Sequence, residues 1–134
     1  MGWVAEKYPL LAKEISDRGH ELGTHGYDHS LVFNQSPSDF EKSLKKSIKI
    51  IENCTSKDVV GFRAPSFSIT KDSEWAYSVV KKVGLKFDSS LFQALRADGG
   101  YGNVSSIKCK PYLIDTPHGP LVEVPLSVSK FLNF

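Results

Sequence analysis

Two histidines and an arginine form the most informative chemical pattern in this chain of 134 residues. His25 and His29 stand four residues apart, directly after a short apolar segment, and residues at this spacing share one face of a helical turn. Both imidazoles could therefore reach one ion, and imidazole is a common ligand for zinc and related divalent metals. Further along the chain, Arg63 and Pro65 place a fixed cation and a rigid ring after another apolar segment. The pattern predicts a metal-assisted hydrolytic site.

Each of these residues, taken alone, also has an ordinary structural explanation. Asp28 could pair with a neighbouring histidine, or it could cap the turn that begins at Ser30. An isolated arginine such as Arg63 most often forms a salt bridge, and an isolated aspartate such as Asp88 most often lies in a turn. The prediction of a site therefore rests on three polar clusters that occur at equivalent places in the chain.

Those equivalent places are the ends of predicted strands. Helical apolar spacing begins near residues 4, 36 and 72, and the short apolar segments expected to be strands span 20–24, 59–62, 85–87, 111–116 and 121–126. In α/β folds, functional groups gather at the carboxyl ends of parallel strands. His25, Arg63 and Asp88 follow the first three strands, so we expect them on one rim. The last two strands flank a Pro/Gly turn and are expected to form a hairpin.

The alternation of helix and strand predicts an α/β fold with about five strands and three main helices. A closed eight-stranded α/β barrel takes about 250 residues, so a chain with about five strands forms only part of such a barrel. The chain also opens on a helix, whereas a strand–helix unit begins with its strand. We therefore expect residues 1–134 to form a single but incomplete domain.

Composition excludes several classes of protein. Seventeen Lys and Arg against fifteen Asp and Glu give a net charge of +2, too small to indicate a nucleic-acid partner. No apolar run approaches the roughly 18 residues that span a bilayer. No signal peptide opens the chain, so a cytoplasmic location is the default expectation. Cys54 and Cys109 have no Cys-x-x-Cys spacing and are expected to be reduced.

The segment from Trp3 to Phe92 resembles the polysaccharide deacetylase family, the group with the NodB-type domain. Gly19–His29 resembles the metal-binding motif of that family, Phe62–Ser68 resembles its Arg-x-Pro motif, and Phe87–Phe92 resembles the aspartate motif that follows. The motif sequences Arg-Ala-Pro-Ser-Phe-Ser and Phe-Asp-Ser-Ser-Leu-Phe are similar to those of a bacterial branch of the family that is associated with exopolysaccharide production. The resemblance covers about two-thirds of the chain with three motifs in order.

The resemblance implies a distorted (β/α) barrel and a hydrolase that removes acetyl groups from N-acetylated sugar units. The implied partner is an N-acetylated poly- or oligosaccharide, and the implied cofactor is a divalent metal, usually zinc and sometimes cobalt or manganese. In that scheme His25 and His29 ligate the metal, which polarises the amide carbonyl and lowers the pKa of bound water.

The resemblance also implies roles for residues beyond the metal ligands. Arg63 would hold and tune a carboxylate base, and the backbone amide at Ser66 would donate a hydrogen bond to the oxyanion. Asp88 would orient the surrounding network. Tyr27 and Phe67 lie within the motifs and are the candidate contacts to substrate.

Two motifs of the family have no counterpart here, and this leaves alternatives open. The family carries an Asp-Asp motif on its first strand and an acid histidine near its last strand, and His118 does not fit the latter pattern. The chain could therefore be a piece of an active deacetylase, impaired in this form. It could also be a non-catalytic, truncated homologue that binds carbohydrate or a partner protein. A different α/β metallohydrolase that acts on a small amide is a third reading.

We expect the chain to associate with itself, because a sheet without its first and last strands exposes unpaired backbone at both edges. Light scattering should show a dimer, a larger assembly or poor solubility. A sharp monomer profile would contradict this prediction.

Overall fold

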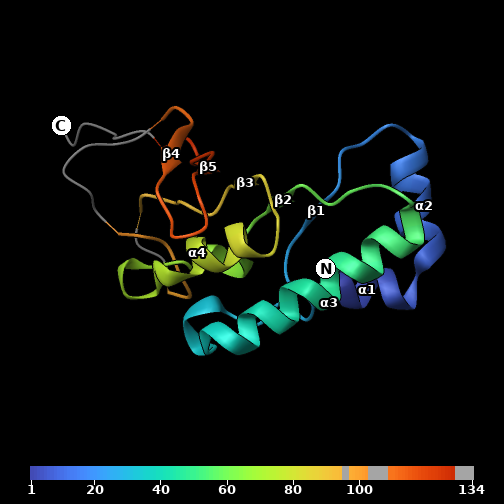
Figure 1. Ribbon diagram of the computed structural model, residues 1–134, viewed down its shortest axis with the longest axis horizontal. Coiled ribbons are helices and arrows are strands. Elements are labelled where there is room, and N and C mark those ends of the chain that lie inside the picture. The colour runs from blue at the N-terminus through green and yellow to red at the C-terminus, as the bar shows by residue number, and fades with distance from the viewer. Residues whose placement is uncertain (95–96, 103–108, 129–134) are drawn as a thin grey trace.

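The computed structural model of the protein describes residues 1–94, 97–102 and 109–128. In this part of the chain, α-helices lie along one side of a five-stranded sheet (Figure 1). The helices are α1 (Gly2–Lys7), α2 (Pro9–Asp17), α3 (Pro37–Thr55) and α4 (Trp75–Lys82), and the strands are β1 (Gly23–Thr24), β2 (Gly61–Phe62), β3 (Phe87–Asp88), β4 (Tyr112–Ile114) and β5 (Leu121–Glu123).

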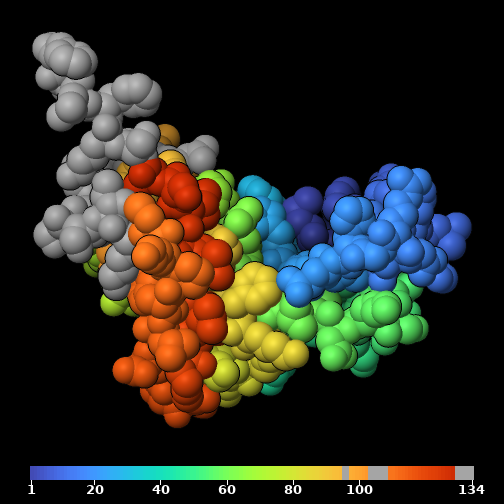
Figure 2. Space-filling view, turned by 90° about the horizontal axis from the view of Figure 1, so that it is seen from above, coloured from blue at the N-terminus to red at the C-terminus, as the bar shows by residue number. Residues whose placement is uncertain are grey.

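The order of the strands is β1-β2-β3-β5-β4. Strands β1, β2, β3 and β5 are parallel to their neighbours, whereas β4 runs antiparallel to β5. The predicted α/β class, the five strands and the terminal hairpin are therefore confirmed. Strands β1 and β4 form the two edges of the described sheet, so this sheet is open, as expected for part of a barrel. The hairpin occupies one end of the molecule and helices α1 and α2 the other (Figure 2).

The prediction of three main helices was wrong at the N-terminus, where the expected helix is two helices. Tyr8 separates them with φ −131°, and Pro9 begins α2. Proline has no backbone N–H to continue the helical ladder and its ring clashes with the preceding turn, so the chain breaks there and restarts. The apolar spacing also suggests burial that the structure does not provide, because Leu11 and Ile15 remain exposed at 49% and 40%.

Helix α3 packs the core against the sheet. Its N-terminus is capped by Ser36, whose Oγ accepts a hydrogen bond from the Asp39 N–H at 3.1 Å. The buried stripe of α3 includes Phe40, which is 1% exposed and meets the rings of Phe62 and Trp75 edge-on at 5.5 and 5.8 Å. These contacts tie α3 to β2 and to α4, and so fix the positions of the strand ends.

The parallel register divides the strand-end residues between two faces of the sheet. Thr24, Phe62, Asp88 and Glu123 are aligned across neighbouring strands and so share one face. That face meets the helices, because Phe62 packs on α3. Side chains alternate along a strand, so the residues that follow Thr24, Phe62 and Asp88 leave toward the opposite face.

None of the helices in the described residues is both long enough and apolar enough to cross a membrane.

Phe40→Ala should lower the free energy of unfolding by about 3–5 kcal/mol, because it removes a fully buried ring and leaves a cavity. Phe33→Ala is the matched control, since Phe33 is 40% exposed and its loss should cost less than about 1 kcal/mol. Urea unfolding of both variants measures the difference. Equal losses would show that α3 does not anchor the sheet through Phe40.

Candidate metal and hydrolytic site

The loop after β1 is held from two helices. Ser47 of α3 donates from its Oγ to the carbonyl of Gly26 at 3.0 Å. The first N–H groups of α1 reach the same loop: Gly2 donates to the Gly26 carbonyl at 3.0 Å, and Trp3 donates to the Tyr27 carbonyl at 2.9 Å. Helix N-termini carry N–H groups without intrahelical partners, so the loop carbonyls satisfy them. The segment that carries both histidines is thereby fixed.

The two histidines predicted to share an ion do lie side by side. The ring centroids of His25 and His29 are 5.0 Å apart, with the planes at 67°. His25 is half-buried and His29 is exposed, with a left-handed φ of 69°. Burial lowers the pKa of His25, and the hydrogen bond to the Arg63 carbonyl only partly offsets this effect. The lowered pKa favours the neutral imidazole that a metal requires.

The proton on His25 can be placed from its partner. Nδ1 of His25 lies 2.6 Å from the backbone carbonyl oxygen of Arg63, and a carbonyl only accepts, so Nδ1 carries the hydrogen. Nε2 then keeps its lone pair for an ion. This arrangement, with one ring nitrogen tied to a backbone carbonyl, is the usual support for a metal-binding histidine.

The pair fits part of a divalent metal site. Two imidazoles that bind one tetrahedral ion at about 2.0–2.1 Å have ring centroids about 5 Å apart, as His25 and His29 do. Within residues 1–94, 97–102 and 109–128, however, no three His, Cys, Asp or Glu side chains come together. The described residues therefore bring two candidate imidazole ligands together, and a metal site of this kind would need further ones.

Arg63 joins the ends of β2 and β3 beside this pair. Its Nε donates to the Ser89 carbonyl at 2.9 Å, and an Nη donates to the Ser89 hydroxyl at 2.8 Å. That hydroxyl donates in turn to the Val124 carbonyl at 2.8 Å. The fork of the guanidinium thus bridges two neighbouring strand ends, while the Arg63 carbonyl holds His25. No carboxylate among the described residues forms a salt bridge with it.

The Arg-x-Pro motif leads into a strained turn. Ser66 and Phe67 both have left-handed φ values, 51° and 55°, which residues other than glycine rarely adopt. A hydrogen bond from the Gly100 N–H to the Phe67 carbonyl, at 2.9 Å, holds the turn. Gly99 must be a glycine, because a Cβ there would lie 2.1 Å from the Ser66 carbonyl oxygen. Strain of this kind is common where backbone groups are aimed at a ligand.

The remaining predicted residues have other partners. The hydroxyl of Tyr27 donates to Glu6 at 2.6 Å, and the ring of Phe67 packs on Phe92 at 5.3 Å. Asp28 accepts from the N–H and hydroxyl of Ser30 at 3.2 and 2.7 Å, which lowers the pKa of Asp28. Of the two roles considered for Asp28, the structure selects the turn cap.

Asp88 lies behind the site, on the helix-facing side of the sheet. It is fully buried, and its carboxylate accepts from the Ser90 hydroxyl at 2.7 Å and the Ser90 N–H at 2.9 Å. The Ser90 hydroxyl also accepts the Ala64 N–H at 2.8 Å, so Asp88 reaches the Arg-x-Pro motif through one serine. Beside it lies Glu123, also fully buried, which sequence reasoning missed. The available signal was an acid inside the apolar strand predicted over 121–126.

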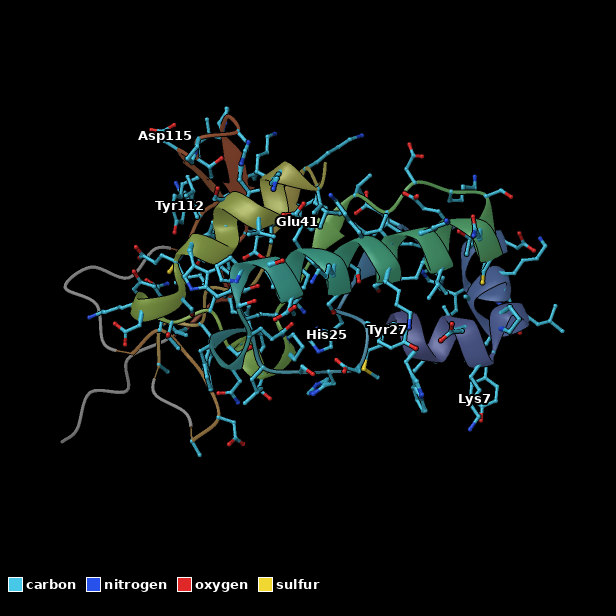
Figure 3. All side chains as sticks on the ribbon, turned by 60° about the horizontal axis from the view of Figure 1, so that its bottom comes forward. Lys7, His25, Tyr27, Glu41, Tyr112 and Asp115 are labelled. Atoms are coloured by element: carbon cyan, nitrogen blue, oxygen red, sulfur yellow. The ribbon has the colours of Figure 1, made fainter. Side chains whose placement is uncertain are left out.

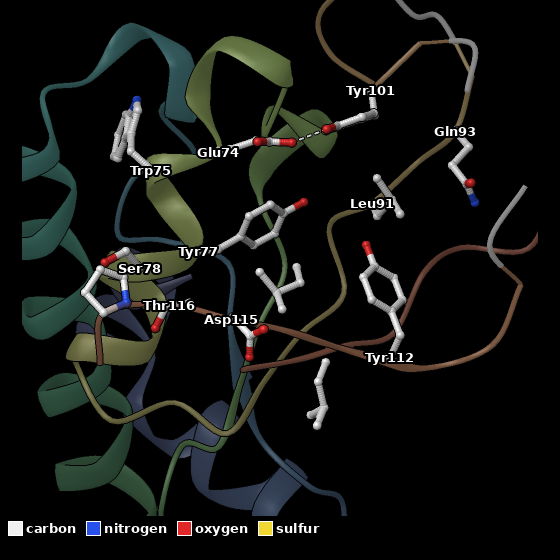
Figure 4. Close-up of a pocket in the computed structure, with 13 residues that line it drawn as sticks. Glu74, Trp75, Tyr77, Ser78, Leu91, Gln93, Tyr101, Tyr112, Asp115 and Thr116 are labelled. Carbon is white, nitrogen blue, oxygen red and sulfur yellow. Dashed lines mark hydrogen bonds between the residues drawn. The ribbon is translucent and has the colours of Figure 1, made fainter. Parts of the chain in front are cut away.

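A cavity of about 830 Å³ opens on this same helix-facing side, between α4 and β4 (Figure 4). Tyr77 and Tyr112 line it, and Tyr101 donates a hydrogen bond to Glu74 at its margin. Neither histidine contributes to its walls. Figure 3 shows Tyr112 and Asp115 at one end of the molecule, apart from His25 and Tyr27.

Comparisons with known proteins agree with these motifs. A family model described as polysaccharide deacetylase matches residues 1–87. The chain is 37% identical over 90 residues to a peptidoglycan deacetylase-like protein of Gibberella zeae, a match that covers 67% of this chain and 26% of that protein. It is 32% identical over 90 residues to the peptidoglycan deacetylase of Helicobacter pylori, covering 67% of this chain and 30% of that protein. The matched part thus spans less than a third of either relative.

A solved structure extends the likeness to the whole fold. A crystal structure from Mycobacterium smegmatis, assigned as a polysaccharide deacetylase, superposes with a TM-score of 0.74 at 27% identity. The match covers 94% of this chain and 38% of that one. A match over this share of the chain supports the partial-barrel architecture.

Arg63→Lys should lower the free energy of unfolding by about 1 kcal/mol, because an ammonium cannot keep both hydrogen bonds to Ser89. Arg18→Lys is the matched control. Arg18 forms an exposed pair with Glu14 one helical turn away, and its replacement should change stability by less than about 0.5 kcal/mol. Urea unfolding compares the two variants, and equal effects would argue against the bridge between β2 and β3.

Proposed function

Because the chain belongs to the polysaccharide deacetylase family, which matches residues 1–87, we propose that it forms part of a metal-dependent hydrolase that removes N-acetyl groups from the sugar units of a polysaccharide. The observation that carries the proposal is the neighbouring pair of imidazoles, one of which is already oriented by a backbone carbonyl. The reaction class is hydrolysis of a linear amide bond.

In this proposal His25 and His29 would hold the metal, for which zinc is the first choice and cobalt or manganese are alternatives. When bound, the ion supplies a Lewis acid for the amide carbonyl and a water of lowered pKa. The hydrogen bond between Nδ1 of His25 and the Arg63 carbonyl would leave the lone pair of Nε2 available to hold the ion. Within the described residues, no third His, Cys, Asp or Glu side chain joins this pair as a ligand.

The remaining motif residues would act on the substrate or on one another. The backbone amide at Ser66, on the strained turn, would donate to the oxygen of the scissile amide as charge develops there. The guanidinium of Arg63 would place a positive charge beside the reacting group while it holds Ser89. Asp88 would act through Ser90, and Phe67 and Tyr27 would flank the sugar. The sequences of the Arg-x-Pro and aspartate motifs favour an exopolysaccharide as the substrate.

A second function is supported by a specific observation. Two protein ligands bind a metal far less tightly than three or four would, and the described chain offers only two. The chain would then be a non-catalytic homologue that binds an N-acetylated oligosaccharide. Binding of such an oligosaccharide in the presence of a chelator, with no release of acetate, would favour this function. Release of acetate by the chain would exclude it.

Calorimetry with zinc tests the proposed metal site. His25→Ala should weaken zinc binding by at least roughly tenfold, because one of two ligands is lost. His20→Ala is the matched control, since His20 is exposed and precedes the loop, and it should bind zinc like the unaltered chain. Equal affinity for zinc in the chain and in His25→Ala would contradict the site.

A further inference from the structure

Two acids are buried side by side, and neither forms a salt bridge with a Lys, Arg or His side chain of the described residues. Asp88 of β3 and Glu123 of β5 are in register on parallel strands, and each side chain is 0% exposed. Both point to the helix-facing side, behind the site that holds the histidines. Two ionised carboxylates in contact inside a protein repel one another and lose their hydration, so at least one of them must hold a proton.

The hydrogen-bond donors around the pair show which acid keeps the charge. Both oxygens of Asp88 receive donors, the hydroxyl and the N–H of Ser90. Glu123 receives one, the Leu91 N–H to Oε1 at 3.0 Å, and no other N–H or O–H in the described part of the chain reaches Oε2. The two carboxyl groups are neighbours on adjacent strands, and Oε2 of Glu123 is a buried oxygen without a donor. Two carboxylates have no hydrogen to share, so a hydrogen bond between them needs a proton, and Glu123 is the group that lacks donors.

We propose that Glu123 is a positioning residue, whose protonated carboxyl donates to the Asp88 carboxylate and so locks the β3 loop that carries the Arg63 contacts. The inference rests on the proposed function only for its consequence at the metal site; the shared proton stands on the geometry of the pair. Nothing in the three sequence motifs assigns a role to Glu123.

The Asp88–Glu123 pair would fix this loop through three successive residues that follow β3. Ser89 binds the guanidinium of Arg63, Ser90 joins Asp88 to the Ala64 N–H, and Leu91 donates to Glu123. Asp88 and Glu123 therefore hold both sides of a loop whose middle meets the Arg-x-Pro motif. Loss of the proton would place two like charges against one another beneath this loop.

Titratable groups around the pair agree with a retained proton. Burial raises the pKa of both acids, and the charge of Asp88 raises that of Glu123 further, to about 10. Tyr77 faces the pair from α4 and Tyr112 from β4; burial raises the pKa of both phenols, and the charge of Asp88 raises it further. The positive charge of Arg63 acts in the opposite direction on Asp88: it lowers the pKa of that carboxyl and so favours its ionised form.

The pair makes the stability of the fold depend on pH in a defined direction. The native state keeps a proton that an unfolded glutamate loses above its ordinary pKa of about 4.3. The native state then binds more protons than the unfolded state, so stability falls as pH rises between that value and about 10. One retained proton corresponds to a folding equilibrium constant that falls by up to about tenfold per pH unit.

Infrared spectroscopy of the unaltered chain at pH 7 tests the proton directly, without any variant. We expect the carbonyl band of a buried, protonated carboxylic acid. Glu123→Gln, which keeps an N–H donor for Asp88 and an oxygen for Leu91, should abolish this band and flatten the dependence of stability on pH. Glu21→Gln, at an exposed glutamate, should change neither. Absence of the band, or an unchanged pH slope in Glu123→Gln, would overturn the proposal.

A zinc titration separates the positioning role from general packing. Glu123→Gln should keep the zinc affinity within about twofold of the unaltered chain, whereas Glu123→Leu, which lacks both polar contacts, should weaken it roughly tenfold. Equal zinc affinity in both variants would reject a positioning role for Glu123. An unaltered chain that binds no zinc would instead reject the proposed metal site, and the infrared band would still decide the acid pair.

Discussion

Parallel register is the constraint on which the other features of this protein depend. Three very short strands, β1, β2 and β3, pair in step, and the ladder continues past their ends, where Arg63 donates to the Thr24 carbonyl at 3.1 Å and Ser89 donates to the Phe62 carbonyl at 2.9 Å. This alignment brings residues from three distant parts of the chain to one edge. It also sorts them by face, because neighbouring residues of a strand point in opposite directions.

The sorting produces two polar layers with different chemistry. On one face, the imidazoles and the guanidinium are half-buried or exposed and can meet a ligand. On the other face, Asp88 and Glu123 are enclosed by the sheet and by α4, where an unpaired charge is costly. Serine side chains connect the layers, since Ser89 serves the arginine and Ser90 serves Asp88. A change behind the sheet can therefore reach the loop at its front through a few short hydrogen bonds.

Membership of the polysaccharide deacetylase family rests on segments that the structure explains physically. The histidine motif is a loop clamped by Ser47 and the N-terminus of α1, and the Arg-x-Pro motif is a bridge followed by a left-handed turn. Each motif thus combines a group that could do chemistry with the backbone contacts that hold it. Two neighbouring imidazoles without a third metal-binding group, within the described residues, are compatible with the catalytic and with the binding function proposed.

The sequence by itself determined the α/β class, the hairpin, the capped helix α3 and the neighbourhood of His25, His29 and Arg63, because apolar periodicity, capping residues and strand-end position are local signals. Only the tertiary structure decided that Asp88 is buried behind the site and that Glu123 lies next to it. The two acids are 35 positions apart in the chain and meet only through the pairing of β3 with β5. No local pattern encodes such a contact, since register and burial arise only when the whole sheet has formed.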